Sequence, residues 1–224
     1  MNTMKIITVL SLTIVSIILG SCSETLFDTE ETRVESDSEK SAEEDASLCE
    51  GCTFSGTLTE SEIKGLIAMR EEEKLASDVY RKFYTLYNVP IFNNISKSED
   101  AHTSAVLYLL NGYGIDDPAL AEEGEFTNEI FTGLYSSLVE KGSTGLIEAL
   151  KVGAYVEELD IADLMKLLEE THNEDVKRVY GNLLRGSEFH LQAYTNMLKL
   201  KGETYEPTVI SMKEYKEIIS VEDE

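Results

Sequence analysis

Apolar residues recur at intervals of three and four between residues 59 and 219, which predicts a series of amphipathic helices. The first is predicted over 59–87, because Thr59 and Glu62 have the spacing of a capping box and Asn88-Val89-Pro90 ends the pattern. No stretch shows the strict alternation typical of a strand, so the sequence predicts an all-α protein. The remaining helices are predicted at about 93–110, 127–141, 143–171, 174–201 and 212–219.

Carboxylates and histidines fall on the inward, otherwise apolar faces of four of these helices. Residues i and i+3 share a helix face, so Glu99 and His102 can both reach an ion beside their helix. Buried carboxylates are costly unless paired, and several that converge would repel one another unless a divalent cation lay between them. The pattern predicts a metal site inside a bundle of helices, with these ligands: Glu73, Glu99, His102, Glu157, Asp160 and His190.

Some of these assignments have alternatives. A shift of one residue in helix phase would make Glu72 and Glu158, rather than Glu73 and Glu157, the inward members. A single histidine on an apolar face is more often a hydrogen-bonded core residue than a ligand, and this is the alternative for His190. An ion pair at the surface is the alternative for the carboxylate and histidine of the second helix. Mixed carboxylate and imidazole ligands suit iron or manganese, with zinc as a further candidate.

The composition excludes some classes of function. The formal net charge is −24, from 43 acidic and 19 basic residues, which argues against nucleic acid as a partner because phosphate binding needs clustered Lys and Arg. The apolar content of 42% is that of a globular protein, and 224 residues fit one domain with tails. The acidic balance suits solubility and a weak attraction of cations.

The first residues have the features of an export signal. Lys5 gives a positive start, and residues 6–19 form an apolar run too short to span a bilayer comfortably. The run ends in Leu19-Gly20-Ser21-Cys22, which resembles a bacterial lipobox. That resemblance implies cleavage before Cys22 and lipid attachment to its thiol, and ordinary signal cleavage is the alternative. The expected location is therefore the bacterial cell envelope, at the outer membrane, through a lipid anchor.

The segment after Cys22 is rich in Glu, Asp and Ser and predicts a disordered tether. Near its end lie Cys49 and Cys52, and paired cysteines outside the cytoplasm are more often oxidised or metal-bound than free. A small local disulfide, a redox role and an accessory metal contact remain open. The chain thus divides into a signal peptide at 1–21, an acidic tether with CxxC at 22–57, a helical domain at 58–202 and a C-terminal extension at 203–224.

Four motifs in the helical domain resemble a known family. They are Glu71-Glu72-Glu73-Lys74-Leu75-Ala76, Ser98-Glu99-Asp100-Ala101-His102, Glu157-Glu158-Leu159-Asp160-Ile161, and Leu184-Arg185-Gly186-Ser187 with His190. Together they resemble the DUF2202 family of the ferritin-like superfamily and, more distantly, rubrerythrin. The resemblance implies a ferritin-like four-helix bundle with an extra short helix in the crossover and a short C-terminal extension. It also implies iron, a reaction with oxygen or peroxide, and a homodimer.

One position departs from the rubrerythrin-like pattern. Those proteins have a second ExxH motif on the fourth helix, whereas this chain has Ser187 in place of the glutamate. Glu188 is next to that position but about 100° further around the helix, so it is expected to face elsewhere. A single metal ion and an asymmetric pair are both consistent with this pattern. A non-catalytic metal-binding protein and a metal-free helical interaction lipoprotein are the alternative functions, and enzymatic activity is left open.

Overall fold

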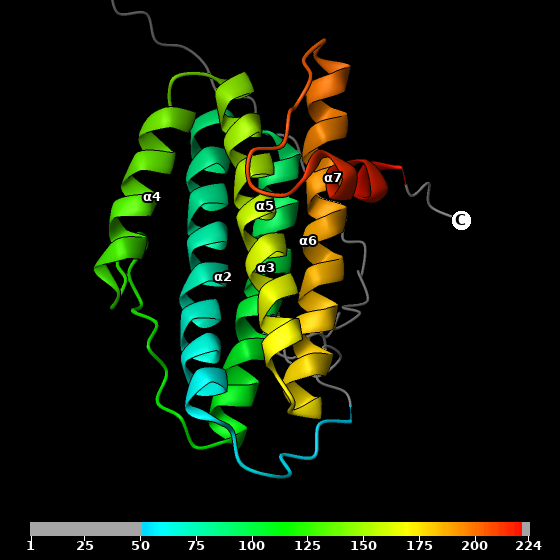
Figure 1. The fold of residues 1–224 in the computed structure, drawn as a ribbon. Helices are drawn as coiled ribbons and strands as arrows, with labels where there is room; N and C mark the ends of the chain where they lie inside the picture. Colours follow the sequence, from blue (N-terminus) through cyan, green and yellow to red (C-terminus); the bar gives the residue numbers. More distant parts are fainter. Residues whose placement is uncertain (1–50, 221–224) are drawn as a thin grey trace, which may run out of the picture. The chain divides into compact units, whose positions relative to one another are not determined.

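The computed structural model describes residues 51–220, which contain six α-helices and no strand (Figure 1). The all-α prediction is therefore confirmed for this part of the chain. The predicted signal peptide, Cys22 and Cys49 lie outside the described residues. None of the helices between residues 51 and 220 combines the length and apolar character needed to cross a bilayer. The helices are α2 (Glu60–Tyr87), α3 (Pro90–Gly112), α4 (Glu129–Gly142), α5 (Leu146–Glu170), α6 (Glu174–Leu200) and α7 (Met212–Ile219).

All six predicted helices are present, with boundaries that differ from the predicted ones by up to three residues. The capping box of Thr59 with Glu62 is confirmed. The largest differences are at the starts of α3 and α5. Helix α3 begins at Pro90, because proline lacks only an N–H that the first turn does not need and its φ is already helical. Asn88 ends α2 in the left-handed conformation, with φ 51°, so the turn between the two helices is very short.

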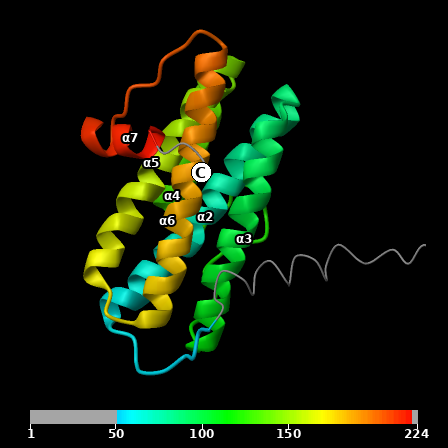
Figure 2. The same cartoon turned by 90° about the vertical axis from the view of Figure 1, so that its right-hand side faces the viewer.

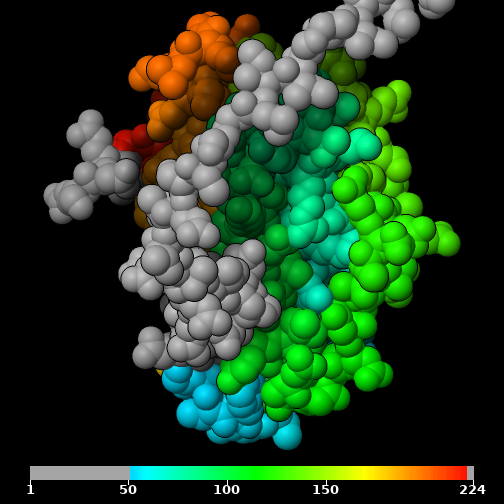
Figure 3. All heavy atoms as spheres, turned by 180° about the vertical axis from the view of Figure 1, so that it is seen from behind, coloured from blue at the N-terminus to red at the C-terminus, as the bar shows by residue number. Residues whose placement is uncertain are grey.

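The four longest helices lie side by side, as the antiparallel pairs α2–α3 and α5–α6 (Figures 1 and 2). Helix α4 carries the chain back along α2 before α5 begins, and the space-filling view shows α4 and the loop before it next to α2 (Figure 3). The short helix α7 lies across α6. Each long helix therefore contributes one face to a common interior.

That interior contains two apolar clusters with a polar layer between them. Along α2, Leu66 and Met69 belong to one cluster and Tyr80 and Phe83 to the other. Glu73 lies between these positions. The same order holds on α3, α5 and α6, so the polar residues of all four helices are at one level.

Glu62, in the first turn of α2, binds the connection between α5 and α6. Its carboxylate accepts hydrogen bonds from the backbone N–H groups of Thr59, His172 and Asn173 and from the hydroxyl of Thr171, at 2.7–3.0 Å. Burial alone would raise the pKa of Glu62, but these four bonds outweigh burial and lower the pKa from 4.5 to about 2. The ionised carboxylate therefore stabilises this end of the molecule.

The low pKa of Glu62 predicts a loss of stability in acid. The carboxylate protonates near pH 4.5 in the unfolded chain and near pH 2 in the folded chain, so its contribution is complete above pH 4.5 and disappears as the pH falls through 2. Thermal unfolding of the wild type and of Glu62→Gln should therefore differ most above about pH 5 and converge toward about pH 2. A difference that stays constant across this range would contradict the assignment.

Glu158 binds the C-terminal segment to α5. The side chain is 0% exposed, and its oxygens accept hydrogen bonds from the backbone N–H groups of Thr208, Val209 and Ile210 at 3.0–3.2 Å. The hydroxyl of Tyr205 adds a fourth donor at 2.5 Å. These contacts hold the segment that leads into α7.

Asp175, in the first turn of α6, binds the start of the described chain. It accepts hydrogen bonds from the backbone N–H groups of Thr53 at 3.1 Å and Phe54 at 2.7 Å. The ring of Phe54 lies on Gly112, where a Cβ would approach a ring carbon to 2.0 Å. These last residues of the predicted tether are therefore held against α3 and α6.

Candidate metal centre

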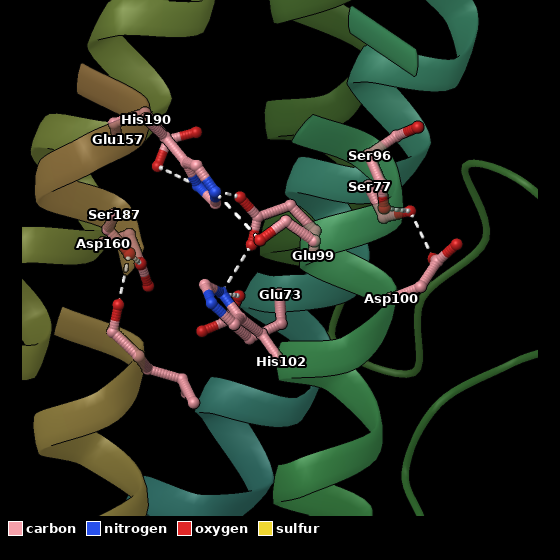
Figure 4. Close-up of polar contacts among 12 residues, drawn as sticks. Glu73, Ser77, Ser96, Glu99, Asp100, His102, Glu157, Asp160, Ser187 and His190 are labelled. Atoms are coloured by element: carbon pink, nitrogen blue, oxygen red, sulfur yellow. Dashed lines mark hydrogen bonds and ion pairs between the residues drawn. The ribbon is translucent and has the colours of Figure 1, made fainter. Parts of the chain in front are cut away.

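The six predicted ligand residues lie in the polar layer between the two apolar clusters. Each of them is at most 8% exposed, and Figure 4 shows their side chains pointing toward one another from α2, α3, α5 and α6. Glu157 belongs to this group, whereas its neighbour Glu158 points to the C-terminal segment instead. Glu188 is not part of the group, as the helix geometry predicted. It lines a groove with Phe189 and residues of α7.

Two carboxylate–histidine groups share Glu99. The first triad is Glu73, Glu99 and His102, and the second triad is Glu99, Glu157 and His190. Within each triad one ligand atom per residue lies within 4.8 Å of the others, so a single ion could contact all three. The two imidazole rings stack at a centroid distance of 5.5 Å, which places the triads next to each other.

Glu99 lies between the two histidines. Its Oε2 is 2.8 Å from Nδ1 of His102, and its Oε1 is 2.7 Å from Nδ1 of His190. The outer carboxylates are further away, with Glu73 Oε2 at 3.2 Å from His102 and Glu157 Oε2 at 3.4 Å from His190. The shared carboxylate is therefore the geometric centre of the site.

Asp160 lies beside the triads without joining either of them. Ser187 donates its hydroxyl to Oδ2 of Asp160, and both side chains are buried. Ser187 occupies the position where the rubrerythrin-like pattern has a glutamate. The carboxylate of Asp160 on α5 therefore lies against Ser187, the position on α6 where the expected glutamate is missing.

The charges of the triads shift several pKa values. Burial alone would raise the pKa of Glu99, but His190 and His102 lower it well below its usual range. Burial alone would lower the pKa of His190, but Glu99 and Glu157 raise it to about 10. Burial raises the pKa of Glu73 to about 8, although His102 opposes this, and burial with the charges of Glu73 and Glu99 raises the pKa of Asp160. A cation must displace protons from these groups, so its affinity should rise with pH.

The hydrogen bonding of the site supports a metal ion. Within residues 51–220, Glu73 Oε1 and Asp160 Oδ1 are buried without a hydrogen-bond partner. Glu99 Oε1 and His190 Nδ1 lie 2.7 Å apart as an ion pair but do not have the geometry of a hydrogen bond. Buried polar atoms in native proteins almost always have a partner, and unpaired ones need an explanation. Cations coordinated by these oxygens and nitrogens would supply the missing partners. The residues present therefore fit a divalent metal.

Three residues outside the predicted ligand set also shape the site. Tyr80 donates its hydroxyl to Glu157 Oε1 at 2.6 Å, and Ser98 Oγ lies 2.9 Å from Nε2 of His190. Gly186 faces His102, where a Cβ would lie 2.5 Å from Nε2. The spacing of Tyr80 from Glu73 was visible in the sequence. The other two contacts join different helices and leave no periodic pattern.

Comparison with known proteins shows the family. A family model described as "Uncharacterized protein domain (DUF2202)" matches residues 62–222. The chain belongs to the DUF2202 family. The match includes both triads, Asp160 and Ser187, so the family predicted from the four motifs is confirmed.

A relative of known sequence and structure extends the comparison. "Uncharacterized protein MJ0754" of Methanocaldococcus jannaschii is 51% identical over 164 residues, which cover 73% of this chain and 89% of the relative. The solved structure titled "Crystal structure of hypothetical protein MJ0754 from Methanococcus jannaschii DSM 2661" is similar to the present one with a TM-score of 0.75 at 50% identity. The structural match covers 76% of this chain and 98% of the chain in that crystal structure. The part of the chain that contains the helices is thus similar in both sequence and fold to this protein.

Proposed function

We propose that this DUF2202 protein is a ferritin-like metalloprotein that binds iron at the two triads and reacts with oxygen or peroxide. The observation that carries the proposal is the pair of buried carboxylate–histidine triads that share Glu99. Such groups are the usual metal ligands of helical bundles. Manganese and zinc have compatible ligand preferences and are the competing metals.

The arrangement of the helices supports the ferritin-like part of the proposal. Ferritin-like bundles with one long crossover place a glutamate from each of two helices and an ExxH motif from each of the other two at one level. Here α2, α3, α5 and α6 supply the ligands, and α4 forms the crossover (Figure 1). The serine at position 187 makes the ligand set asymmetric.

Bound iron would supply a redox-active Lewis acid in a site closed to bulk water. The residues of this chain hold and orient that ion. Glu99 would help to hold an ion in either triad, and Nδ1 of His102 and of His190 is the ring nitrogen that faces this carboxylate. The apolar clusters above and below would limit the access of water and strengthen electrostatic interactions within the site.

The location of the protein also remains a proposal. The lipobox-like sequence ending at Cys22 supports export and a lipid anchor in the outer membrane of a bacterial envelope. Metal ions would be its partners, and a homodimer would be its assembly.

Anaerobic addition of Fe(II) followed by air tests the proposal. We expect two equivalents of iron to bind, oxygen to be consumed and a ferric absorption band to appear in the near-ultraviolet, whereas protein loaded with Zn(II) should show none of these changes. Tight binding of iron without consumption of oxygen or peroxide would favour a non-catalytic metal-binding protein instead. A melting temperature unchanged by chelator, iron, manganese and zinc would favour a metal-free helical module, because a ligand that binds only the native state raises stability.

A further inference from the structure

The two triads differ in how their ligands are held, and the geometry points to an order of loading. We propose that the first cation binds at the second triad, which is Glu99 with Glu157 and His190. The other cation then binds more weakly at the first triad. The proposal depends on the proposed function, because it requires that the triads bind metal. It assigns Tyr80 and Ser98 as positioning residues of the tighter position.

Both outer ligands of the second triad are fixed by a hydrogen bond from outside it. Tyr80 donates to Oε1 of Glu157 at 2.6 Å, which leaves Oε2 to face His190. Ser98 lies 2.9 Å from Nε2 of His190, so an imidazole that binds metal through Nδ1 can donate its other N–H to the serine hydroxyl. Partners of this kind set the tautomer and orientation of a ligand, and their removal typically weakens metal binding by about 10- to 100-fold.

The outer ligands of the first triad lack such partners. Oε1 of Glu73 has no hydrogen-bond partner, and no hydrogen bond to Nε2 of His102 is found among the described residues. That ring edge faces Gly186, which offers space and no side-chain donor or acceptor. His102 and Glu73 are therefore held by packing and by their contact with each other. A cation that binds at the first triad must also fix the orientation of these two side chains.

The shared carboxylate adds to the difference. Once a cation lies in the second triad, Glu99 is attracted to that ion, and a second ion nearby is repelled by the charge of the first. Both effects weaken the later step. Titration should therefore show two separate binding steps, with dissociation constants that differ by at least about tenfold.

Titration of the full chain with Co(II) alone tests this order. Binding is monitored by calorimetry and by the visible spectrum of the bound ion. Ser98→Ala and Tyr80→Phe should each weaken the first step by about 10- to 100-fold and leave the second step nearly unchanged. Ser98→Thr, which keeps the hydroxyl, should restore the first step and its spectrum. Gly186→Ala should instead impair the second step, because its Cβ would press on His102.

The outcomes separate the two proposals. If the intact chain takes up no Co(II), the proposed metal site itself is wrong. If Co(II) binds in one step, or if Ser98→Ala weakens only the later step, the metal site stands and the order of loading is overturned. Ser98 is only half-buried, so the Ser98→Ala variant should fold. It therefore tests the order of loading even if Gly186→Ala does not fold.

Discussion

Replacing Glu99 with glutamine should abolish the binding of both cations. Glu99 is the only residue common to the two triads, and each of its oxygens lies within 2.8 Å of a histidine nitrogen. Glutamine keeps the size of the side chain but removes the negative charge and offers only one acceptor oxygen. Each position would keep one carboxylate and one imidazole, and neither pair has the charge needed to hold a divalent ion in a buried site.

The measurement is the metal content per chain by elemental analysis, after loading with Fe(II) without oxygen and removal of free metal. We expect two equivalents in the wild type, one in Glu73→Gln and none in Glu99→Gln. Glu188→Gln is the matched control, because Glu188 lies on α6 near the site but lines the outer groove. A Glu99→Gln protein that retains an equivalent of iron would show that the triads do not share this ligand.

Helical periodicity predicted most of this architecture. The six helices and the inward positions of Glu73, Glu99 and His190 follow from a repeat of 3.6 residues that each helix obeys by itself. The helix boundaries were less predictable. Pro90 was interpreted as the end of one helix but is the start of the next, since proline is compatible with both roles.

The sequence favoured Glu157 as the inward ligand but left Glu158 as an alternative. Both side chains are buried, and both belong to the same turn of α5. What separates them is the C-terminal segment, which brings three backbone N–H groups and the hydroxyl of Tyr205 to Glu158. That segment is about 50 residues further along the chain, so no local pattern could reveal the contact.

The contacts that orient the ligands were also beyond the sequence. Ser98 is next to Glu99 and resembles any half-buried polar residue, until α6 brings His190 beside it. Asp160 and Ser187 likewise meet only because α5 and α6 pack together. Sequence periodicity identifies the inward residues, and the packing of the helices determines which of them meet.

Replacing Glu158 with alanine should strongly destabilise the protein and release its C-terminal segment. The change leaves the N–H groups of Thr208, Val209 and Ile210 without their acceptor, and it empties a site that is fully buried. Each buried donor left unpaired costs about 1–3 kcal/mol, and the segment can limit this loss by moving into water. We expect a decrease of about 3 kcal/mol in the free energy of unfolding.

Urea unfolding gives the change in stability, and hydrogen exchange of residues 205–219 shows where it arises. Glu206→Ala is the matched control, because Glu206 lies in the same segment but is exposed. It should change the free energy of unfolding by less than about 0.5 kcal/mol. In Glu158→Ala the amides of the segment and of α7 should exchange faster, while those of α2 and α3 keep their protection. Faster exchange throughout all the helices would mean that Glu158 supports the whole core and does not act mainly through the C-terminal segment.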